Sequence, residues 1–203
     1  MTQEMTSARL DILNASAYCF ATHGAEATSI DDIARHLGAT KGKIYHHFRS
    51  KGELLTAVRK HSVQLTLDHV SPLYRAGGAP IAQFHAMSRA HVEAMINKLD
   101  YHRVVVETLR SNGGRSTTAY ERDLLDELRL LQETYENQFR DVLVRGMADG
   151  SMRAQNVSVA LHTVLMLLNA PVHWYSPRDS DTDTDRAAIA QQIADMATGA
   201  IRA

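Results

Sequence analysis

The chain has 203 residues, of which 44% are hydrophobic and 22% charged, so it is long and apolar enough to bury a core, and a disordered chain is excluded. Its single cysteine, Cys19, excludes an internal disulfide and a cysteine-based zinc site, which suits a reducing cytoplasm. The formal net charge is only −1, which excludes a protein that is basic over its whole surface.

The N-terminal residues 1–11 carry neither a basic start nor an apolar stretch, so they do not form a secretory signal. The first predicted helix spans residues 7–23. Its apolar positions recur at helical spacing and end at Gly24, a residue that readily adopts the left-handed conformation that closes a helix. These apolar positions are Leu10, Leu13, Ala17 and Phe20.

A second, short helix is predicted from about residue 29. Thr28 or Ser29 can cap it, because Asp31 and Asp32 lie three residues after them and can bond back to the cap amide. Its inner face is predicted to consist of Ile30, Ile33, Ala34 and Leu37.

Residues 38–48 continue this pattern with a tight turn and a third helix. Gly38 permits a positive φ in the turn, and Thr40 is a good cap for the helix that follows. Ile44 and Phe48 are spaced to pack inward. The side chains predicted to face outward are Lys41, Lys43, Tyr45 and His46. Two helices joined by a turn of about three residues, the second short and cationic, form a helix-turn-helix.

The lysines in the first turn of the third helix lower the stability of that helix. A lysine in the first turn opposes the helix dipole by about 0.3 to 1 kcal/mol, and Lys43 stands where a capping-box Glu would help Thr40. Gly42 weakens the helix further and leaves the surface low enough for another molecule to approach closely. Residues 28–60 carry seven Lys or Arg against three Asp or Glu. A DNA major groove, lined by phosphates, explains this arrangement better than a solvated surface does.

The sequence after the third helix supports the same interpretation. Ser50 and Glu53 can form a capping box, so the next helix is predicted to start at Lys51. Lys51 would then present a cation to the groove beside free backbone amides, and we expect it to anchor a phosphate.

The segment TSIDDIARHLGATKGKIYHHFRSKGELL, residues 28–55, resembles the DNA-binding segment of the TetR family of transcriptional regulators. The shared features are the small-residue turn, the glycine in the recognition helix, the aromatic–x–His–Phe run and the Ser–Lys pair. The resemblance implies an all-helical dimer with an N-terminal DNA-binding domain, here 1–55, and a C-terminal effector-binding and dimerisation domain, here 56–203. It also implies that DNA is contacted by Thr28, Ser29, Thr40, Lys41, Gly42, Lys43, Tyr45, His46 and Lys51. Residues 1–8 contain no cation, so we expect no minor-groove contact from them.

The rest of the chain is predicted to be helical as well. Breaks at 75–80, 111–116 and 148–151 divide it into helices of roughly 81–100, 101–111, 117–148, 156–175 and 184–202. The longest apolar run, from Val157, is interrupted by His162 and Asn169 and is shorter than the roughly 20 residues of a membrane span, so no membrane partner is expected. Its apolar face suits either a core or a helix–helix dimer seam, and we assign part of it, Leu161, Leu165 and Leu168, to the seam.

Residues 168–177, LNAPVHWYSP, resemble the Trp–Tyr–x–Pro ending of the TetR subgroup that responds to acyl-CoA thioesters. This resemblance implies an apolar effector channel near Trp174, with a cation such as Arg103 to meet the coenzyme phosphates. The alternative is that Trp174 is a packed aromatic at a domain or dimer boundary, and Pro171 argues against one uninterrupted helix here.

No catalytic, metal or cofactor site is expected. Cys19 and His23 share a helix face, but that face carries core residues, so Cys19 is predicted to be buried and inert. The acidic run at 181–185 lacks the glycine and the final glutamate of a calcium loop. No zinc-binding H-E-x-x-H and no phosphate-cradling glycine motif is present.

The sequence therefore predicts a cytoplasmic, homodimeric repressor that binds a palindromic DNA operator and responds to a small effector of unknown identity. Two alternatives remain at this point. One is a helical small-molecule-binding or enzymatic protein with a vestigial helix-turn-helix, which would not bind duplex DNA at physiological salt. The other is a DNA-binding protein without an effector, whose C-terminal domain would lack a cavity.

Overall fold

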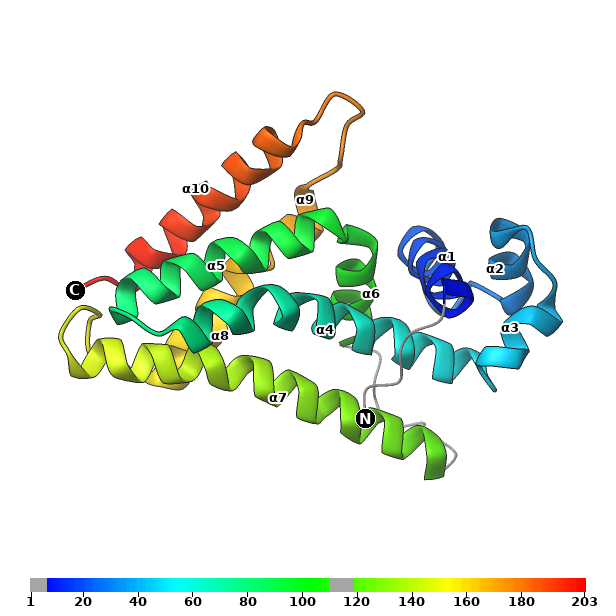
Figure 1. Cartoon of the computed structure of the whole chain (residues 1–203), viewed down its shortest axis with the longest axis horizontal. Helices are drawn as coiled ribbons and strands as arrows, with labels where there is room; N and C mark the ends of the chain where they lie inside the picture. Colours follow the sequence, from blue (N-terminus) through cyan, green and yellow to red (C-terminus); the bar gives the residue numbers. More distant parts are fainter. Residues whose placement is uncertain (1–6, 110–118) are drawn as a thin grey trace. The chain divides into compact units, whose positions relative to one another are not determined.

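The computed structural model describes residues 7–109 and 119–203, and every regular element within them is a helix (Figure 1). The helices are α1 (Ser7–His23), α2 (Ile30–Leu37), α3 (Lys41–His47), α4 (Lys51–Ala76), α5 (Pro80–Asn97), α6 (Leu99–Leu109), α7 (Ala119–Ala148), α8 (Val157–Leu168), α9 (Pro171–Trp174) and α10 (Asp183–Ile201). The predicted all-α fold is confirmed. The predicted break at 111–116, and residues 1–6 of the N-terminal arm, lie outside the described residues.

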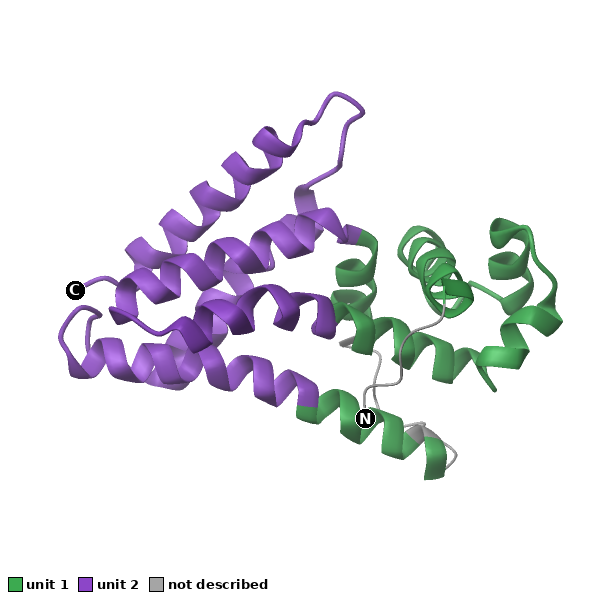
Figure 2. Cartoon of the chain, viewed as in Figure 1, with its two compact units in different colours: residues 1–62, 100–130 green, residues 63–99, 131–203 purple. Residues whose placement is uncertain are grey.

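The chain forms two compact units, coloured separately in Figure 2. Unit 1 comprises residues 1–62 and 100–130, and unit 2 comprises 63–99 and 131–203. This division differs from the predicted boundary after residue 55, because α6 and the start of α7 pack with the N-terminal helices. The hydroxyl of Tyr101 on α6, for example, donates to Oδ1 of Asn14 on α1 at 2.8 Å.

The core of unit 1 is formed by the apolar faces that the sequence predicted for α1 to α3. Ile33 on α2, Ile44 on α3 and Phe48 directly after α3 are buried, together with Leu13 and Phe20 of α1. Leu10 and Leu37 are only half-buried. The short helices α2 and α3 have too few residues to be stable alone, so this shared core holds them in place.

Unit 2 is built around α5, which packs against α10, α8 and α9. The buried amide of Gln83 on α5 donates to the carbonyls of Leu73 and Tyr74 at 3.1 and 2.6 Å, near the end of α4. Its oxygen accepts from Nη2 of Arg145 on α7 at 2.6 Å. One side chain thus joins α4, α5 and α7.

The apolar segment Val157–Trp174 is not the single helix that was predicted for 156–175. α8 ends at Leu168, and α9 begins at Pro171, which has no N–H for the preceding turn and whose ring clashes with it. By length and composition this segment could cross a membrane. In the structure it is two helices, and α8 packs against α10 and α5, as a core helix does.

Candidate DNA-binding surface

The start of α2 is fixed by the predicted capping box. Oγ of Ser29 accepts from the amide of Asp32 at 3.2 Å, and the Asp32 carboxylate accepts from the amide of Ser29 at 2.9 Å. The hydroxyl of Ser29 also donates to the Asp32 carboxylate at 2.6 Å. This bond, followed by the one from the Ser29 amide, is the main reason that the pKa of Asp32 is lowered, with a smaller contribution from Arg35. Ser29 is exposed, so the cap lies at the protein surface.

The turn and α3 follow the predicted helix-turn-helix pattern. Gly38 closes α2 in the left-handed conformation, with φ of 65°, and Oγ1 of Thr40 accepts from the amide of Lys43 at 3.4 Å. α2 and α3 pack against each other through their apolar faces. The exposed side of α3 carries the four residues that were predicted to face outward, Lys41, Lys43, Tyr45 and His46, together with Gly42.

The two lysines of α3 differ in their partners. Nζ of Lys41 lies 2.6 Å from a carboxylate oxygen of Asp31 on α2, and this contact raises the pKa of Lys41. Lys43 is exposed and has no ion pair within the described ranges. Lys43 is therefore the cation on α3 whose charge is not matched by the protein itself.

Gly42 is not required by the packing of the chain. A Cβ built at this position would meet only Oγ1 of Thr40, at the ordinary contact distance of 3.8 Å, and φ is not in the left-handed region. A close approach by another molecule stays the predicted reason for this glycine.

The C-terminal end of α3 is held by a residue that the sequence did not identify. Nη1 of Arg9 on α1 donates to the carbonyl of His47 at 3.1 Å, and its guanidinium lies 4.2 Å from the ring centroid of Phe48. Burial lowers the pKa of His47, and the charges of His46 and Arg9 add to this. Arg9 precedes His47 by 38 residues, so no local pattern points to the contact.

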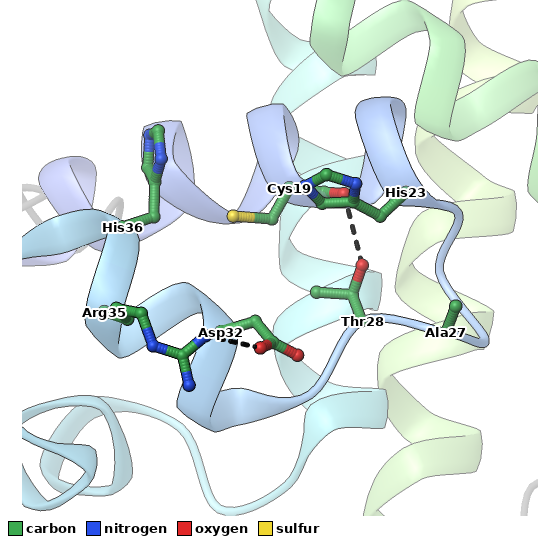
Figure 3. A pocket seen from close by; sticks show the side chains of 7 residues that line it. All are labelled: Cys19, His23, Ala27, Thr28, Asp32, Arg35 and His36. Carbon is green, nitrogen blue, oxygen red and sulfur yellow. Dashed lines mark hydrogen bonds and ion pairs between the residues drawn. The ribbon is translucent and has the colours of Figure 1, made fainter.

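Thr28 was predicted to contact DNA, and the structure contradicts this. Its side chain is 2% exposed, and its hydroxyl donates to the carbonyls of Gly24 and Cys19 at 2.8 and 3.2 Å. Figure 3 shows Thr28 directed back toward α1. Of the two candidate caps, Ser29 alone remains as a surface contact.

Lys51 was predicted to anchor a phosphate, but its ammonium is already occupied. Nζ lies 2.9 Å from the carbonyl oxygen of Ala25, 3.1 Å from that of Glu26 and 3.0 Å from that of Thr28. An ammonium group has three N–H donors, so these contacts use all of them. The charge of Lys51 is therefore turned toward the segment between α1 and α2.

The predicted Ser50–Glu53 cap is present and is joined by two further residues. The amide of Glu53 donates to Oγ of Ser50 at 3.0 Å, while the Glu53 carboxylate accepts from the amide of Arg49 at 2.6 Å and the hydroxyl of Tyr120 at 3.0 Å. The Arg49 guanidinium lies 4.4 Å from the centroid of the Tyr120 ring. The first turn of α7 thus holds the first turn of α4.

A hollow of about 460 Å³ lies between α1 and α2 (Figure 3). It is lined by Cys19, His23, Ala27, Thr28, Asp32, Arg35 and His36. The Cys19 thiol is buried, as predicted, and burial raises its pKa, with a further contribution from Asp32, so it stays protonated at neutral pH. Residues 7–109 and 119–203 contain no group of three or more His, Cys, Asp or Glu that could hold a metal ion.

The predicted dimer-seam leucines lie inside one protomer. Leu161, Leu165 and Leu168 are buried by the chain itself, so they have no surface left for a second copy, and this assignment is corrected. The exposed apolar side chains of α8 are Val159 and Met166.

The two predicted effector residues lie in different units. Arg103 is half-buried on α6, in unit 1. Trp174 is more than half exposed at the end of α9, in unit 2, with its ring edge-on to that of Tyr175 at 6.0 Å. Trp174 is not packed inside its own protomer, so its assignment to an effector channel or to a domain or dimer boundary stays a prediction.

Comparison with known proteins decides the family. Residues 12–58 match the family model of bacterial regulatory proteins of the tetR family, and residues 77–201 match the model of the tetracyclin repressor-like C-terminal domain. The chain belongs to the TetR family. It is a DNA-binding transcriptional regulator and not an enzyme, as the resemblance in residues 28–55 implied.

Relatives of this TetR protein cover most of its length. The HTH-type transcriptional repressor KstR2 of Mycolicibacterium smegmatis is 28% identical over 182 residues, which are 84% of this chain and 80% of the relative. The structure of the ketosteroid transcriptional regulator KstR2 of Mycobacterium tuberculosis matches with a TM-score of 0.80 and 21% identity, over 98% of this chain and 97% of that one. The structure of AibR in complex with isovaleryl coenzyme A and operator DNA matches with a TM-score of 0.74 and 21% identity, over 97% and 98%.

Proposed function

We propose that this protein is a cytoplasmic repressor that binds a palindromic operator as a homodimer and is released by a small-molecule effector, a coenzyme A thioester with an apolar acyl group. The main support for operator binding is Lys43 on α3, which is exposed and has no ion pair within the described residues. A positive charge near the start of a helix opposes the dipole, and nothing on the described surface compensates it. A phosphate or a base edge of the major groove would supply the missing partner.

The contacts of the proposed surface divide into two kinds. Lys43, Tyr45 and His46 lie on the exposed side of α3, the helix that would enter the groove, and are proposed to read base edges. Ser29 and Thr40 cap the two helices at the surface and are proposed to meet the phosphate backbone. Lys41 can exchange Asp31 for a phosphate, because both members of that pair are about half exposed.

The proposed dimer uses the exposed apolar face of α8. Val159 and Met166 are seven residues apart, which places them on the same side of the helix, and Met166 is 78% exposed. α8 packs against α10, which exposes Met196. Exposed apolar side chains on two neighbouring helices are typical of a helix–helix interface between two copies.

The proposed effector class rests on relatives and on the HWYSP run. AibR is described in complex with isovaleryl coenzyme A, and KstR2 as a ketosteroid regulator, so acyl and ring-bearing thioesters are the compounds to test first. Arg103 and Trp174 are kept as two separate candidates for effector contact. The effector must bind a DNA-incompetent arrangement more tightly, because equal affinity for both states shifts nothing.

Selection of bound duplexes from random DNA tests the operator. We expect a palindrome whose half-sites are about one helical turn apart or slightly more, because two recognition helices must meet successive major grooves. A footprint on a single half-site at saturation would contradict the dimer, and failure to bind any duplex at physiological salt would favour the small-molecule-binding alternative.

Titration of the operator complex tests the effector. Acyl-CoA thioesters of different chain and ring type are added beside the free acids and coenzyme A alone, and we expect release by some thioester at micromolar concentration. Arg103→Ala should blunt this release, whereas Arg129→Ala, which changes an exposed arginine on α7, should not. Release by unrelated aromatic or cationic compounds alone, or by none, would overturn the thioester proposal.

A further inference from the structure

The position of Lys51 raises the question of what its charge is for. It is the first residue of α4, and its three N–H donors are directed at the carbonyls of Ala25, Glu26 and Thr28, at 2.9, 3.1 and 3.0 Å. These carbonyls belong to residues 24–29, the segment that connects α1 to α2, which we call the α1–α2 connection. A phosphate would find no free N–H on this ammonium.

The α1–α2 connection is held from two sides. From within, the amide and the hydroxyl of Thr28 both donate to the carbonyl of Gly24, at 3.2 and 2.8 Å, and Gly24 itself has φ of 82°. From outside, Lys51 binds three of the remaining carbonyls. Helical hydrogen bonds hold only its two ends, where the amide of Gly24 donates to the carbonyl of Phe20 and the amide of Ile33 donates to that of Ser29. Between these ends, the side chains of Thr28 and Lys51 bind the carbonyls of the segment and determine its path.

The path of this segment determines where α2 begins. The α1–α2 connection ends at Ser29, the cap of α2, and the next residues include Asp31, which pairs with Lys41 of α3 at 2.6 Å. A shift of the segment would move the surface cap and the partner of a recognition-helix lysine together.

We propose that Lys51 is a positioning residue for DNA binding: it fixes the α1–α2 connection, and through it Ser29 and the first turn of α2, without contacting DNA itself. This inference rests on the DNA-binding surface proposed above. It reverses the role that the sequence implied for Lys51, and it assigns the direct electrostatic contact to Lys43.

The geometry requires lysine and not only a positive charge. An ammonium directs three donors in a tetrahedral arrangement, which fits three carbonyls that converge on one atom. The guanidinium of arginine directs its donors within a plane and is bulkier, so it cannot reproduce these three contacts, although it binds phosphate at least as well. Lys51→Arg therefore separates the two roles.

The experiment measures binding of the full chain to its selected operator and to an unrelated duplex of equal length, over a range of salt concentrations. The variants are Lys51→Met, Lys51→Arg and the matched control Lys43→Met. Thermal unfolding of each variant checks that it folds, and stoichiometric titration with operator measures the fraction of protein that can bind DNA. We expect both Lys51 variants to lose affinity for the operator and for the unrelated duplex by roughly tenfold, because the displaced Ser29 is a proposed phosphate contact. The slope of log K against log salt should stay unchanged, because Ser29 carries no charge. Lys43→Met should weaken both complexes and lower the salt slope by about 1 per subunit.

Amide hydrogen exchange gives a second readout. Residues 24–29 should exchange faster in both Lys51 variants and at the original rate in Lys43→Met. Wild-type operator binding by Lys51→Arg, or a salt slope that falls by about 1 in Lys51→Met, would overturn the inference in favour of a phosphate contact. An unchanged slope in Lys43→Met would count against the proposed DNA surface instead, and exchange at 24–29 would still decide whether Lys51 holds the segment.

Discussion

A buried histidine makes the stability of unit 2 depend on pH. His91 on α5 is 3% exposed, and its Nδ1 lies 2.8 Å from the hydroxyl of Tyr135 on α7. Burial lowers the pKa of His91 to about 4, against a weak opposite effect of Asn169, while Nε2 has no hydrogen-bond partner in the described chain. The folded protein therefore holds this ring neutral.

The first prediction follows from that pKa. As the pH falls below about 6.5, the unfolded chain takes up a proton at His91 before the folded chain does, so stability is lost down to about pH 4, by on the order of 3 kcal/mol. Urea unfolding of wild type and His91→Leu between pH 7 and pH 4 measures this. The variant should show the weaker pH dependence, and His162→Leu, which changes an exposed histidine, should match wild type. If the free energy of unfolding depended equally on pH in wild type and in His91→Leu, His91 would not be the group responsible.

A second prediction concerns Gly146, a glycine whose missing side chain the packing requires. A Cβ on Gly146 of α7 would lie 2.4 Å from Sδ and 2.7 Å from Cγ of Met152, which is itself buried. Gly146→Ala should therefore destabilise the fold by about 1 kcal/mol, although alanine is the better helix former by a similar amount. In a Met152→Ala background the same change should stabilise it. Additive effects in this double-mutant cycle, measured by urea unfolding, would show that the two residues are not in contact.

Residue exposure was predicted better than residue partners. The outward side of α3 and the caps at Ser29 and Thr40 follow from spacing and side-chain chemistry within a few residues. The partners of Thr28 and Lys51 were not predicted because they are set by the path of the chain: the side chain of Thr28 is buried, and Lys51 binds carbonyls 23 to 26 residues away. Local patterns contain no information about such contacts.

Between elements, the contact of α7 with α4 gives the third prediction. The Tyr120 hydroxyl donates to the buried Glu53 carboxylate at the start of α4, and the raised pKa of Tyr120 reflects its burial first and Glu53 second. Tyr120→Phe removes this donor but keeps the ring beside Arg49, so we expect a loss of about 0.5 to 1 kcal/mol, because water can partly replace the hydroxyl. Urea unfolding beside Tyr18→Phe, an exposed tyrosine on α1, is the test. Equal stabilities for the two variants would mean that the contact contributes nothing.

Helix positions were predicted because their signals are local. Gly24 and the break at 75–80 end α1 and α4 where expected, and Ser50 precedes α4. Pro171 already argued from the sequence against one uninterrupted helix at 156–175, and the structure places the break between Leu168 and Pro171. The inclusion of α6 and the start of α7 in unit 1 needed the structure, since packing between distant segments leaves no periodic trace in a single sequence.

For the whole molecule, the proposed dimer determines whether two recognition helices can act together. The leucines of α8 were assigned to the dimer seam, but they are buried inside the protomer. Hydrophobic periodicity identifies the apolar face of a helix, but it cannot distinguish a face in the core from a face in an interface. Val159 and Met166 are the side chains that the protomer leaves uncovered. A single half-site bound by one recognition helix has few base contacts, so operator affinity should depend on the second copy.

The fourth prediction tests this surface. Met166→Glu places a carboxylate in the centre of the proposed interface, where two copies related by a two-fold axis would bring the charges together, so we expect a dimer dissociation constant raised by at least about a hundredfold. Because Met166 is exposed in the protomer, the variant should keep the wild-type helix content and thermal unfolding of the monomer. Val144→Glu, which changes an exposed valine on α7, is the matched control and should leave assembly unchanged.

Sedimentation equilibrium measures the dissociation constant, and operator titration at several protein concentrations shows whether binding is lost with the dimer. A Met166→Glu protein that remains dimeric and binds the palindrome normally would remove α8 from the interface, and a monomeric variant that still binds the full palindrome tightly would separate DNA binding from dimerisation.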